Sequence, residues 1–353
     1  MAGRAAPRGR KRTTITDVAE RAGVSVPTVS RVLSGNYPVA TATRAKVLRA
    51  VRELDYVANA HARALAGATT KTVAFVVHDI TWPFFAHIAQ GVEEQARQEG
   101  RMCLVCTTQG DPERELEAVE QMREQHADAV ILVGGGFEAE ENRQRLVHFA
   151  RLLDEAGSRL VLCGRPSPGD DVPATIVEYD NAGGAFAMTS HLLSLGHRRI
   201  AFLGVRPGFT TVVERVEGYR RAHETFRVTP DPTLLREGDF LRSYGYEATR
   251  ELLAERTDVT AIFAVTDVVA AGVLHALRDS GVRVPEEMSV VGYDDIPMTM
   301  ELTPALTTVH IPHEELGRTA VRLALHRHES TVPQHVVLGT HIAVRDSVAP
   351  PPM

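Results

Sequence analysis

The sequence predicts an α/β protein in which a small all-helical head is followed by a larger, two-lobed body built on parallel sheets. Three observations predict this fold class. Apolar residues recur at helical spacing in the first 70 residues, short apolar runs alternate with amphipathic segments in the rest, and 353 residues exceed the size of one ordinary core. We therefore expect a disordered basic arm at 1–13, a head at 14–56, a linker at 57–70 and a body at 71–350.

Charge is divided unevenly between the head and the body. Residues 1–70 carry 12 Lys or Arg against 4 Asp or Glu, a net charge of +8, whereas the remaining residues carry 27 against 41, a net charge of −14. A basic head on an acidic body indicates that a polyanion binds at one end only. The sequence has three cysteines, an odd number, which argues against a disulfide framework.

The apolar runs of the chain exclude a membrane protein. None approaches the roughly 18 residues that a membrane-spanning helix needs. The basic start of the sequence leads into no apolar stretch, which argues against a secretory signal. We therefore expect a cytoplasmic protein that has no membrane partner.

The head begins with two short helices. Thr14 and Asp17 resemble a capping box for the first helix, and Gly23 is expected to end it. A second helix is expected after Ser25, which can act as its cap, and Pro27 stands in its first turn, where a missing N–H costs little.

A third helix is expected from Thr41 to Leu54. The apolar spacing of the three helices predicts the core of the head. Its expected members are Val18, Ala19, Ala22, Val29, Val32, Leu33, Ala45, Val47, Leu48, Val51 and Leu54.

The body alternates strands and helices. Candidate strands are the apolar runs at 73–77, 103–107, 129–134, 159–164, 174–179, 199–204, 261–266 and 288–293. Candidate helices are the amphipathic segments at 84–99, 112–125, 183–195, 214–226, 244–256 and 268–280. This order predicts parallel sheets covered on both faces, in numbers that suit two lobes. A ligand is expected in a cleft between the lobes, at the carboxyl ends of strands.

The stretch from Thr16 to Gly35 has the layout of a helix-turn-helix. Arg31 can donate two hydrogen bonds to a guanine, while Val26 and the methyl group of Thr28 can contact thymine methyls. The alternative is a small helical bundle with no nucleic-acid role, which the fold, the turn and the local charge disfavour. Near its start the second helix presents Ser25, Val26, Pro27, Thr28, Ser30 and Arg31.

A family resemblance joins these observations. TITDVAERAGVSVPTVSRVLSG resembles the head of the LacI-type (lactose-repressor) transcription regulators, and RELDYVANAHARALAG resembles the hinge of that family. DITWPFF, RVEGYRRA, TDVVAAGVLHALRDSGVRVPEEMSVVGYDD and LTTVHIP continue the match in order through the body. The resemblance implies a helix-turn-helix head and a two-lobed, periplasmic-binding-protein-like domain that binds a small-molecule effector.

For the head, the resemblance implies that Val26, Pro27 and Arg31 read the operator. Proline is unusual at its position because it offers no side-chain donor, so readout there is expected to be steric or by methyl contact. Thr14 and Asn59 are also expected among the DNA contacts.

For the hinge, the resemblance places Leu65 where the family inserts an apolar wedge into the minor groove, which bends DNA. Leu65 could instead pack as an ordinary linker residue. Residues 57–67 are Ala-rich and few, so we hypothesise that they become helical only when two chains sit side by side on DNA. The family commonly has proline where this chain has Ala58, which leaves the start of the hinge open.

For the body, the resemblance implies an effector site. Phe84 and Phe85 could stack on a sugar or base ring, Arg215 could donate two hydrogen bonds, and Asp294 could accept from hydroxyls. Asp267 begins a helix, so it could either cap that helix or contact the ligand. The full expected set is Trp82, Phe84, Phe85, Arg215, Thr266, Asp267, Asp294 and His310.

Three of these residues depart from the family pattern. Thr266 stands where the family often has Asn, Trp82 where it often has Asn or Ser, and His310 where Arg is frequent. These departures leave the identity of the effector open. Tryptophan at the mouth of the cleft favours a ligand that is larger or flatter than a pentose.

Enzymatic and metal-binding alternatives find little support. The sequence contains no Gly-x-Gly-x-x-Gly run, no phosphate-binding loop and no Gly-x-Ser-x-Gly elbow. Cys103 and Cys106 lie three apart on a strand and should point to opposite faces. The histidines lack a zinc-like partner pair. We therefore predict no enzyme activity, no metal and no cofactor.

Together the residues and the resemblance predict a DNA-binding transcription regulator. We expect a homodimer on a near-palindromic operator, controlled by a small-molecule effector that we expect to be a carbohydrate, with repression relieved by an inducer. A corepressor would act through the same linkage with the opposite sign. The alternative from another class is a solute-binding receptor of the same two-lobed architecture, which the basic head disfavours.

Overall fold

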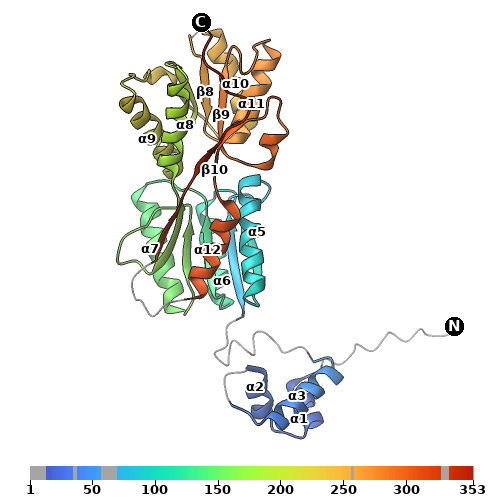
Figure 1. The fold of residues 1–353 in the computed structure, drawn as a ribbon. Helices are drawn as coiled ribbons and strands as arrows, with labels where there is room; N and C mark the ends of the chain where they lie inside the picture. Colours follow the sequence, from blue (N-terminus) through green and yellow to red (C-terminus); the bar gives the residue numbers. More distant parts are fainter. Residues whose placement is uncertain (1–12, 35–37, 57–69, 256–257, 327–333, 353) are drawn as a thin grey trace, which may run out of the picture. The chain divides into compact units, whose positions relative to one another are not determined.

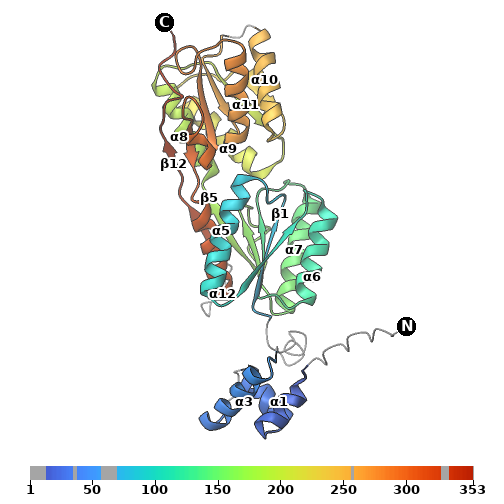
Figure 2. The same cartoon turned by 90° about the vertical axis from the view of Figure 1, so that its right-hand side faces the viewer.

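The structure is a computed structural model that describes residues 13–34, 38–56, 70–255, 258–326 and 334–352. The chain divides into two compact units, residues 1–70 and 71–353. We describe each unit by itself and call them the head and the body (Figures 1 and 2). No helix in the described ranges is both long and apolar enough to cross a bilayer.

Three helices form the head: α1 (Ile15–Ala22), α2 (Val26–Ser34) and α3 (Thr41–Glu53). Their core contains Val18, Ala19, Val29, Val32, Val47 and Ala50. Ala45 and Leu48, which we expected in this core, are exposed. The inward face of α3 runs through Val47, Ala50 and Val51 instead, because these positions repeat at the spacing of one helix face.

Local chemistry fixes the ends of α1 as the sequence predicts. The backbone N–H of Thr14 donates to Asp17 Oδ2 at 2.7 Å, and the N–H of Asp17 donates to Thr14 Oγ1 at 3.4 Å, which completes a capping box. Gly23 ends the helix with a φ of 64°, a conformation that glycine adopts without strain. Arg21 then ties α1 to α3 through an ion pair with Glu53 at 2.6 Å.

The N-terminal lobe of the body is a six-stranded sheet, of order β11-β5-β4-β3-β1-β2, in which all neighbouring strands are parallel. Side chains alternate between its faces: Phe75 of β1 packs in the core beneath α5 and α12, whereas Val76 packs beneath α6 and α7. The strands are β1 (Thr72–Val77), β2 (Met102–Thr107), β3 (Ala129–Val133), β4 (Leu160–Cys163), β5 (Ala174–Tyr179) and β11 (His335–Leu338). The helices are α5 (Pro83–Gln98), α6 (Pro112–Glu124), α7 (Glu140–Glu155) and α12 (His313–Leu325).

The C-terminal lobe repeats this architecture with the order β12-β10-β9-β8-β6-β7. Its sheet is parallel except for β12, which runs antiparallel to β10 at the edge. The helix pairs α8/α9 and α10/α11 flank the sheet on its two faces (Figure 1). The strands are β6 (Ile200–Val205), β7 (Leu235–Glu237), β8 (Ala261–Ala264), β9 (Ser289–Asp294), β10 (Thr307–His310) and β12 (His341–Ala343). The α-helices are α8 (Asn181–Ser194), α9 (Thr210–Thr225), α10 (Arg242–Ala254) and α11 (Asp267–Asp279), and two short 3₁₀ helices, η1 (Pro232–Leu234) and η2 (Pro297–Met300), complete the lobe.

The chain crosses between the lobes three times. It crosses at Asp180 after β5, at 311–312 after β10, and at 339–340 between β11 and β12. The first and third crossings are bonded to each other, since the N–H of Asp180 donates to the carbonyl of Leu338 at 3.1 Å and Thr340 Oγ1 donates to the carbonyl of Asp180 at 3.1 Å. We call the side of the body where these three crossings lie the hinge side.

The fold confirms the predicted α/β class, with a helical head and a two-lobed body of largely parallel sheets. All eight expected strands are present in the body. Among the described residues, the sequence analysis missed eight elements, namely the helices α7 and α12, the 3₁₀ helices η1 and η2, and the strands β7, β10, β11 and β12.

Candidate functional site

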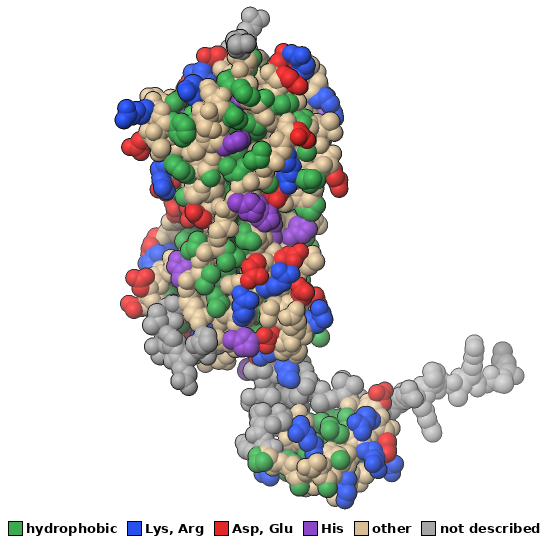
Figure 3. Space-filling model, in the orientation of Figure 1, with side chains coloured by type: hydrophobic (Ala, Val, Ile, Leu, Met, Phe, Trp, Pro, Cys, Tyr) green, Lys and Arg blue, Asp and Glu red, His purple; other side chains and the backbone are tan. Residues whose placement is uncertain are grey.

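The first candidate site is the outer face of α2 in the head. Ser25, Val26, Pro27 and Arg31 are exposed, and Thr28 and Ser30 are half-buried. The opposite face of the helix supplies Val29 and Val32 to the core. The residues that we expected to meet base edges therefore share the solvent-facing side of one helix, and Figure 3 shows Lys and Arg side chains on the visible face of this unit. Asn59, Leu65 and the expected hinge at 57–67 lie outside the described residues.

The second candidate site is a cavity of about 530 Å³ between the two lobes of the body. Its size falls within the range of small-molecule sites. The walls come from segments that follow the strands of both sheets, as in other open α/β sheets. His78 follows β1, Gly134 follows β3, Arg165 follows β4, Arg206 follows β6 and Thr266 lies just beyond β8.

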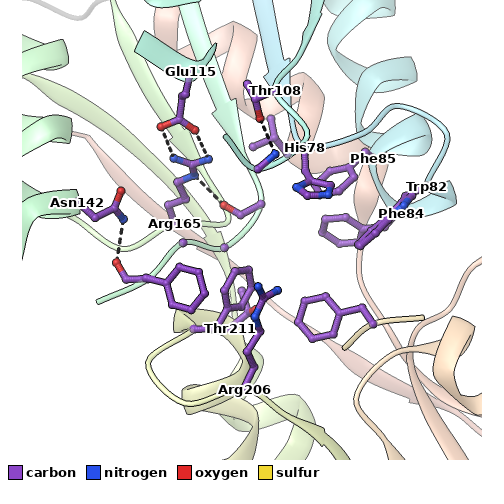
Figure 4. Close-up of a pocket in the computed structure, with 18 of the residues that line it drawn as sticks. His78, Trp82, Phe84, Phe85, Thr108, Glu115, Asn142, Arg165, Arg206 and Thr211 are labelled. Atoms are coloured by element: carbon purple, nitrogen blue, oxygen red, sulfur yellow. Dashed lines mark hydrogen bonds and ion pairs between the residues drawn. The ribbon is translucent and has the colours of Figure 1, made fainter. Parts of the chain in front are cut away.

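Aromatic side chains form one wall of the cavity. Trp82 and Pro83 start α5, which directs Phe84 and Phe85 toward the space between the lobes (Figure 4). Phe84 contacts Phe85 edge-on at 5.1 Å, and Trp82 stacks near Phe85 at 6.0 Å. Tyr179, at the end of β5, lies 6.2 Å from Phe84. Such a wall offers flat apolar faces to a ring-shaped ligand.

Arg215 on α9 connects the hinge to the C-terminal sheet. Its Nε donates to Asn181 Oδ1 at 2.9 Å, its Nη1 donates to the carbonyl of Val265 at 2.5 Å, and its plane lies 3.7 Å from the ring centre of Tyr293. Nη2 makes longer contacts of 3.4 Å with Asp294 Oδ1 and with a tyrosine hydroxyl. Arg215 is 4% exposed and lines the cavity, and the two long contacts of Nη2 are the ones that a ligand oxygen could replace most easily.

Asp294 ends β9 at the cavity wall. Its backbone φ of 112° is rare for a residue with a side chain, and such strain is concentrated at functional sites. Burial raises the pKa of the Asp294 carboxyl, and the nearby Arg215 opposes this rise. A carboxyl in this setting can accept a hydrogen bond from a ligand hydroxyl, or donate one when it is protonated.

Asp267 neither caps α11 nor lines the cavity. The cap of α11 is Thr266, whose hydroxyl accepts from the N–H of Val269, so the capping interpretation of Asp267 is wrong. Asp267 is fully buried and does not line the cavity; it accepts from the N–H of Ile296 at 3.0 Å and from the Thr308 hydroxyl at 2.5 Å. Through these two hydrogen bonds Asp267 holds the segment after Asp294 in place on the side away from the cavity.

His310 also lies off the cavity wall. It ends β10 beside the second crossing, where Nδ1 bonds to Asp295 Oδ2 at 2.8 Å. Arg345 completes this group by donating to Asp295 Oδ1 at 2.6 Å. The histidine therefore takes part in a polar cluster at the hinge side, and the other six expected residues of the body line the cavity.

An ion pair buried in the N-terminal lobe forms another part of the wall. Arg165 donates to both carboxylate oxygens of Glu115, at 2.8 and 3.2 Å, and its Nε donates to the carbonyl of Gly134 at 2.8 Å. Asn142 lies nearby and donates to the carbonyl of Phe137 at 2.8 Å (Figure 4). These groups give the cavity a polar side away from the Trp82 and Phe84 rings.

Comparison with known proteins identifies the family. A model described as "Bacterial regulatory proteins, lacI family" matches residues 14–59, and one described as "Periplasmic binding protein-like domain" matches residues 189–348. The chain is 39% identical over 345 residues to the HTH-type transcriptional regulator CelR of Thermobifida fusca, which covers 96% of this chain and 99% of the relative. The chain belongs to the lacI family.

Other similarities agree with this assignment. The HTH-type transcriptional repressor PurR of Haemophilus influenzae is 34% identical over 89% of this chain and 90% of the relative. A solved CelR–cellobiose complex is 37% identical, with a TM-score of 0.70, over 95% of this chain and all of that one. The lac repressor dimer bound to operator and an anti-inducer is 26% identical, with a TM-score of 0.79, over 96% of this chain and all of that one. This lacI-family chain is thus a DNA-binding transcription regulator that a small-molecule effector controls.

Several cavity residues of this lacI-family member escaped the sequence analysis. Tyr179, Arg165, Arg206, Phe209 and Phe240 all line the cavity. Each lies at or just after the carboxyl end of a strand or in the loop that follows it, which is the signal that could have identified them.

The two cysteines of β2 point to opposite faces of the N-terminal sheet. Cys103 packs toward one face of the N-terminal sheet and Cys106 toward the other, as predicted for positions three apart on a strand. Burial raises the pKa of the Cys103 thiol to about 11, so it is protonated at neutral pH. Within the described part of the chain, no group of three or more His, Cys, Asp or Glu side chains is arranged to hold a metal ion.

Proposed function

We propose that this lacI-family regulator is a cytoplasmic homodimeric repressor, that it grips a near-palindromic operator, and that a neutral sugar of disaccharide size releases it. The observation that carries the effector class is the composition of the cavity. Aromatic faces on one side oppose hydrogen-bonding groups on the other, within a volume of about 530 Å³. We further propose that the protein binds this sugar without converting it.

The chemistry of the wall favours a carbohydrate. Sugars present apolar C–H faces that stack on aromatic rings and hydroxyls that need charged or amide partners. Phe84 and Trp82 offer the rings, and Asp294, Arg215 and Asn142 offer acceptors and donors. Figure 4 shows Asn142 and Arg165 across the cavity from Trp82 and Phe84, which suits a ligand that turns an apolar face to one wall and hydroxyl groups to the other. The relative CelR has been solved with cellobiose, which makes that disaccharide the first ligand to test.

We assign the expected residues their roles on this basis. Phe84, Phe85 and Trp82 would stack on the sugar, and Asp294 and Arg215 would bond to its hydroxyls. Asp267 and His310 would act indirectly, since Asp267 lies behind Asp294 and His310 lies at the hinge side. In the head, Val26, Pro27 and Arg31 would read base edges, with Ser25, Thr28, Ser30 and Thr14 placing the helix against the backbone.

The edge of the N-terminal sheet supports dimerisation. The outermost strand, β2, carries Met102, which is 65% exposed, and Val105, which is 50% exposed. An exposed apolar edge strand of this kind is a surface on which a second chain can pack. A lacI-family relative, the lac repressor, has been solved as a dimer on its operator. A two-fold dimer would present one head to each half-site.

The test of the effector class is a release assay. The full-length protein is bound to labelled operator DNA, and fluorescence anisotropy is followed as cellobiose is added, with a purine base in parallel because PurR relatives also match. We expect cellobiose to release the DNA, Phe84→Ala to abolish that response, and Phe226→Ala, which truncates a phenylalanine at the surface, to leave it unchanged. Release by the purine alone would contradict the proposal that the effector is a sugar. Conversion of cellobiose during the assay would contradict the proposal that the protein binds the sugar without converting it.

A further inference from the structure

A short backbone bridge joins the two lobes across the cavity. Phe137, from the loop after β3, pairs with Phe209, from the loop after β6, in an isolated antiparallel bridge. On one side of it, the N–H of Thr210 donates to the carbonyl of Gly136 at 2.9 Å; on the other, the N–H of Glu138 donates to the carbonyl of Gly208 at 2.8 Å. Every bond in this bridge runs from one lobe to the other.

Side chains reinforce the bridge. The rings of Phe137 and Phe209 meet edge to face at 5.4 Å, and Phe209 meets Phe240 at 5.5 Å. The guanidinium carbon of Arg206 lies 5.0, 5.1 and 5.9 Å from the centres of these three rings. A cation placed over several rings is attracted by each of them. Through these cation–π contacts, Arg206 connects Phe137 of the N-terminal lobe to Phe209 and Phe240 of the C-terminal lobe.

Within the described part of the chain, the guanidinium of Arg206 donates no hydrogen bond, so its contacts with the three rings face no competing hydrogen-bond acceptor. Figure 4 shows its side chain reaching up into the cavity from the C-terminal lobe. The cavity itself lies between this contact and the hinge side, because Tyr179, next to the crossing at Asp180, also lines it. The covalent crossings therefore join the two lobes on one side of the cavity, and this non-covalent contact joins them on another.

We propose that residues 135–138 and 206–210, together with Phe240, form a clasp that must open for an effector to enter or leave, and that Arg206 sets how readily it opens. The proposal goes beyond the proposed function, since it concerns the closure of the two lobes and holds for any effector class. The clasp shifts the population between closed and open lobes, and the apparent affinity of a ligand follows that population.

The rival explanation is that Arg206 simply contacts the ligand. The two differ in kinetics. Loss of a ligand contact raises the dissociation rate and leaves the association rate nearly unchanged. Loss of a clasp raises both rates, because entry and exit pass through the same opening.

The reporter of the test is the single tryptophan of the chain, Trp82, which lines the cavity. Its quenching by acrylamide in the full-length protein without ligand measures how open the cleft is. In Arg206→Ala we expect the opening equilibrium to increase by about 2- to 30-fold, the range that loss of a cation–π contact gives. Arg221→Ala is the matched control, because Arg221 lies over the ring of Phe186 at 5.6 Å within the C-terminal lobe.

A second variant leaves the guanidinium in place. A Cβ at Gly135 would meet the ring of Phe209 at 2.7 Å, so Gly135→Ala should push the two halves of the clasp apart. We expect more quenching in this variant too, which keeps the test decisive if Arg206→Ala fails to fold. Stopped-flow fluorescence with cellobiose should then show both rate constants raised in each variant.

Two results would overturn the clasp. One is unchanged quenching of Trp82 in both folded variants. The other is a raised dissociation rate alone, which would make Arg206 a ligand contact. If cellobiose failed to bind the parent protein, the proposed effector class would be contradicted. The quenching measurement needs no ligand and would still test whether the clasp holds the lobes closed.

Discussion

Asp267 is a carboxyl group that the fold buries completely for a structural purpose. Its two oxygens accept from the N–H of Ile296 and the hydroxyl of Thr308, which holds the segment after β9 against α11. Burial and the nearby Asp294 both raise the pKa of Asp267 well above its usual value. The group is thus held as a neutral acid over a wider pH range than an exposed aspartate.

This pKa shift predicts how stability depends on pH. In the unfolded chain Asp267 ionises near its usual pKa of 3.8, whereas in the folded chain it stays protonated to higher pH. Its contribution to stability is therefore fully present below pH 3.8 and is lost as pH rises toward the raised folded pKa. In Asp267→Asn, which cannot ionise, we expect this decline in the free energy of unfolding above pH 3.8 to become shallower. Urea unfolding at several pH values measures it, and an unchanged slope would contradict the shift.

Asp267→Ala is the destabilising partner of that variant. It leaves the N–H of Ile296 and the Thr308 hydroxyl without their acceptor, at a cost of about 1–3 kcal/mol for each buried group left unpaired.

Arg31 is the residue of the head that we expect to determine operator choice. It is exposed on α2, on the same face as Pro27, which lies four residues earlier and is also exposed. Arg31→Ala should weaken operator binding by about 1–3 kcal/mol, the discrimination that one bidentate contact to guanine provides. Anisotropy with operator and with random DNA at one salt concentration checks this. Equal losses on both DNAs would show that Arg31 contacts only phosphate.

The residues of the cavity show why sequence reasoning finds one part of a site and misses another. Phe84 and Arg215 stand in local motifs that fix their place beside a strand or within a helix. Arg206 and Arg165 stand in irregular loops, and their partners, Phe137 and Glu115, come from elsewhere in the chain. No local pattern specifies such a pair, because only the tertiary fold brings the two segments together.

At the scale of whole elements, three helix pairs pack closely enough for backbones to touch. Glycine makes this approach possible in α5/α12, α8/α9 and α10/α11, where an added Cβ at Gly317, Gly218 or Gly272 would overlap a carbonyl oxygen of the neighbouring helix. The α5/α12 pair matters most for the site, because α5 carries Phe84 and α12 follows the second crossing.

Gly317→Ala should therefore destabilise the N-terminal lobe. Its methyl group would overlap the carbonyl oxygen of Ile88, which is backbone and cannot rotate away. We expect a loss of about 1–3 kcal/mol, as for other insertions into packed interiors. Thermal unfolding measures it. Gly339→Ala is the control because a Cβ there meets nothing within 4 Å, and an equal loss in both variants would contradict the packing argument.

The four strands that the sequence did not predict, β7, β10, β11 and β12, share a physical reason. β11 is a four-residue strand with alternating exposure, and it pairs with β5 in the register His335 to Ile176. β10 also has four residues, and β7 and β12 have three each. Strands this short carry little apolar signal, and their pairing partners are remote in sequence. The eight predicted strands were found because most of them are buried on both faces and therefore form continuous apolar runs.

At the scale of the whole molecule, the two units divide the work by charge. The head carries a net charge of +8 and the body one of −14. The positive charge of the head attracts the phosphates of DNA, whereas the negative charge of the body repels them. Effector control then requires that closure of the lobes changes the affinity of the head for the operator, which holds only if the sugar binds the released and the DNA-bound states unequally.

This division predicts the behaviour of a protein that lacks residues 1–70. The body forms a compact unit with its own core, so it should fold and bind cellobiose with the affinity of the full chain. It should lose operator binding entirely, because the basic charge and the exposed face of α2 go with the head. Calorimetry with the sugar and anisotropy with the operator measure the two functions separately, with the full-length protein at the same salt concentration as the control. A solute receptor of the same architecture would lose nothing by this deletion, and DNA binding retained by the body would place the DNA site outside the head.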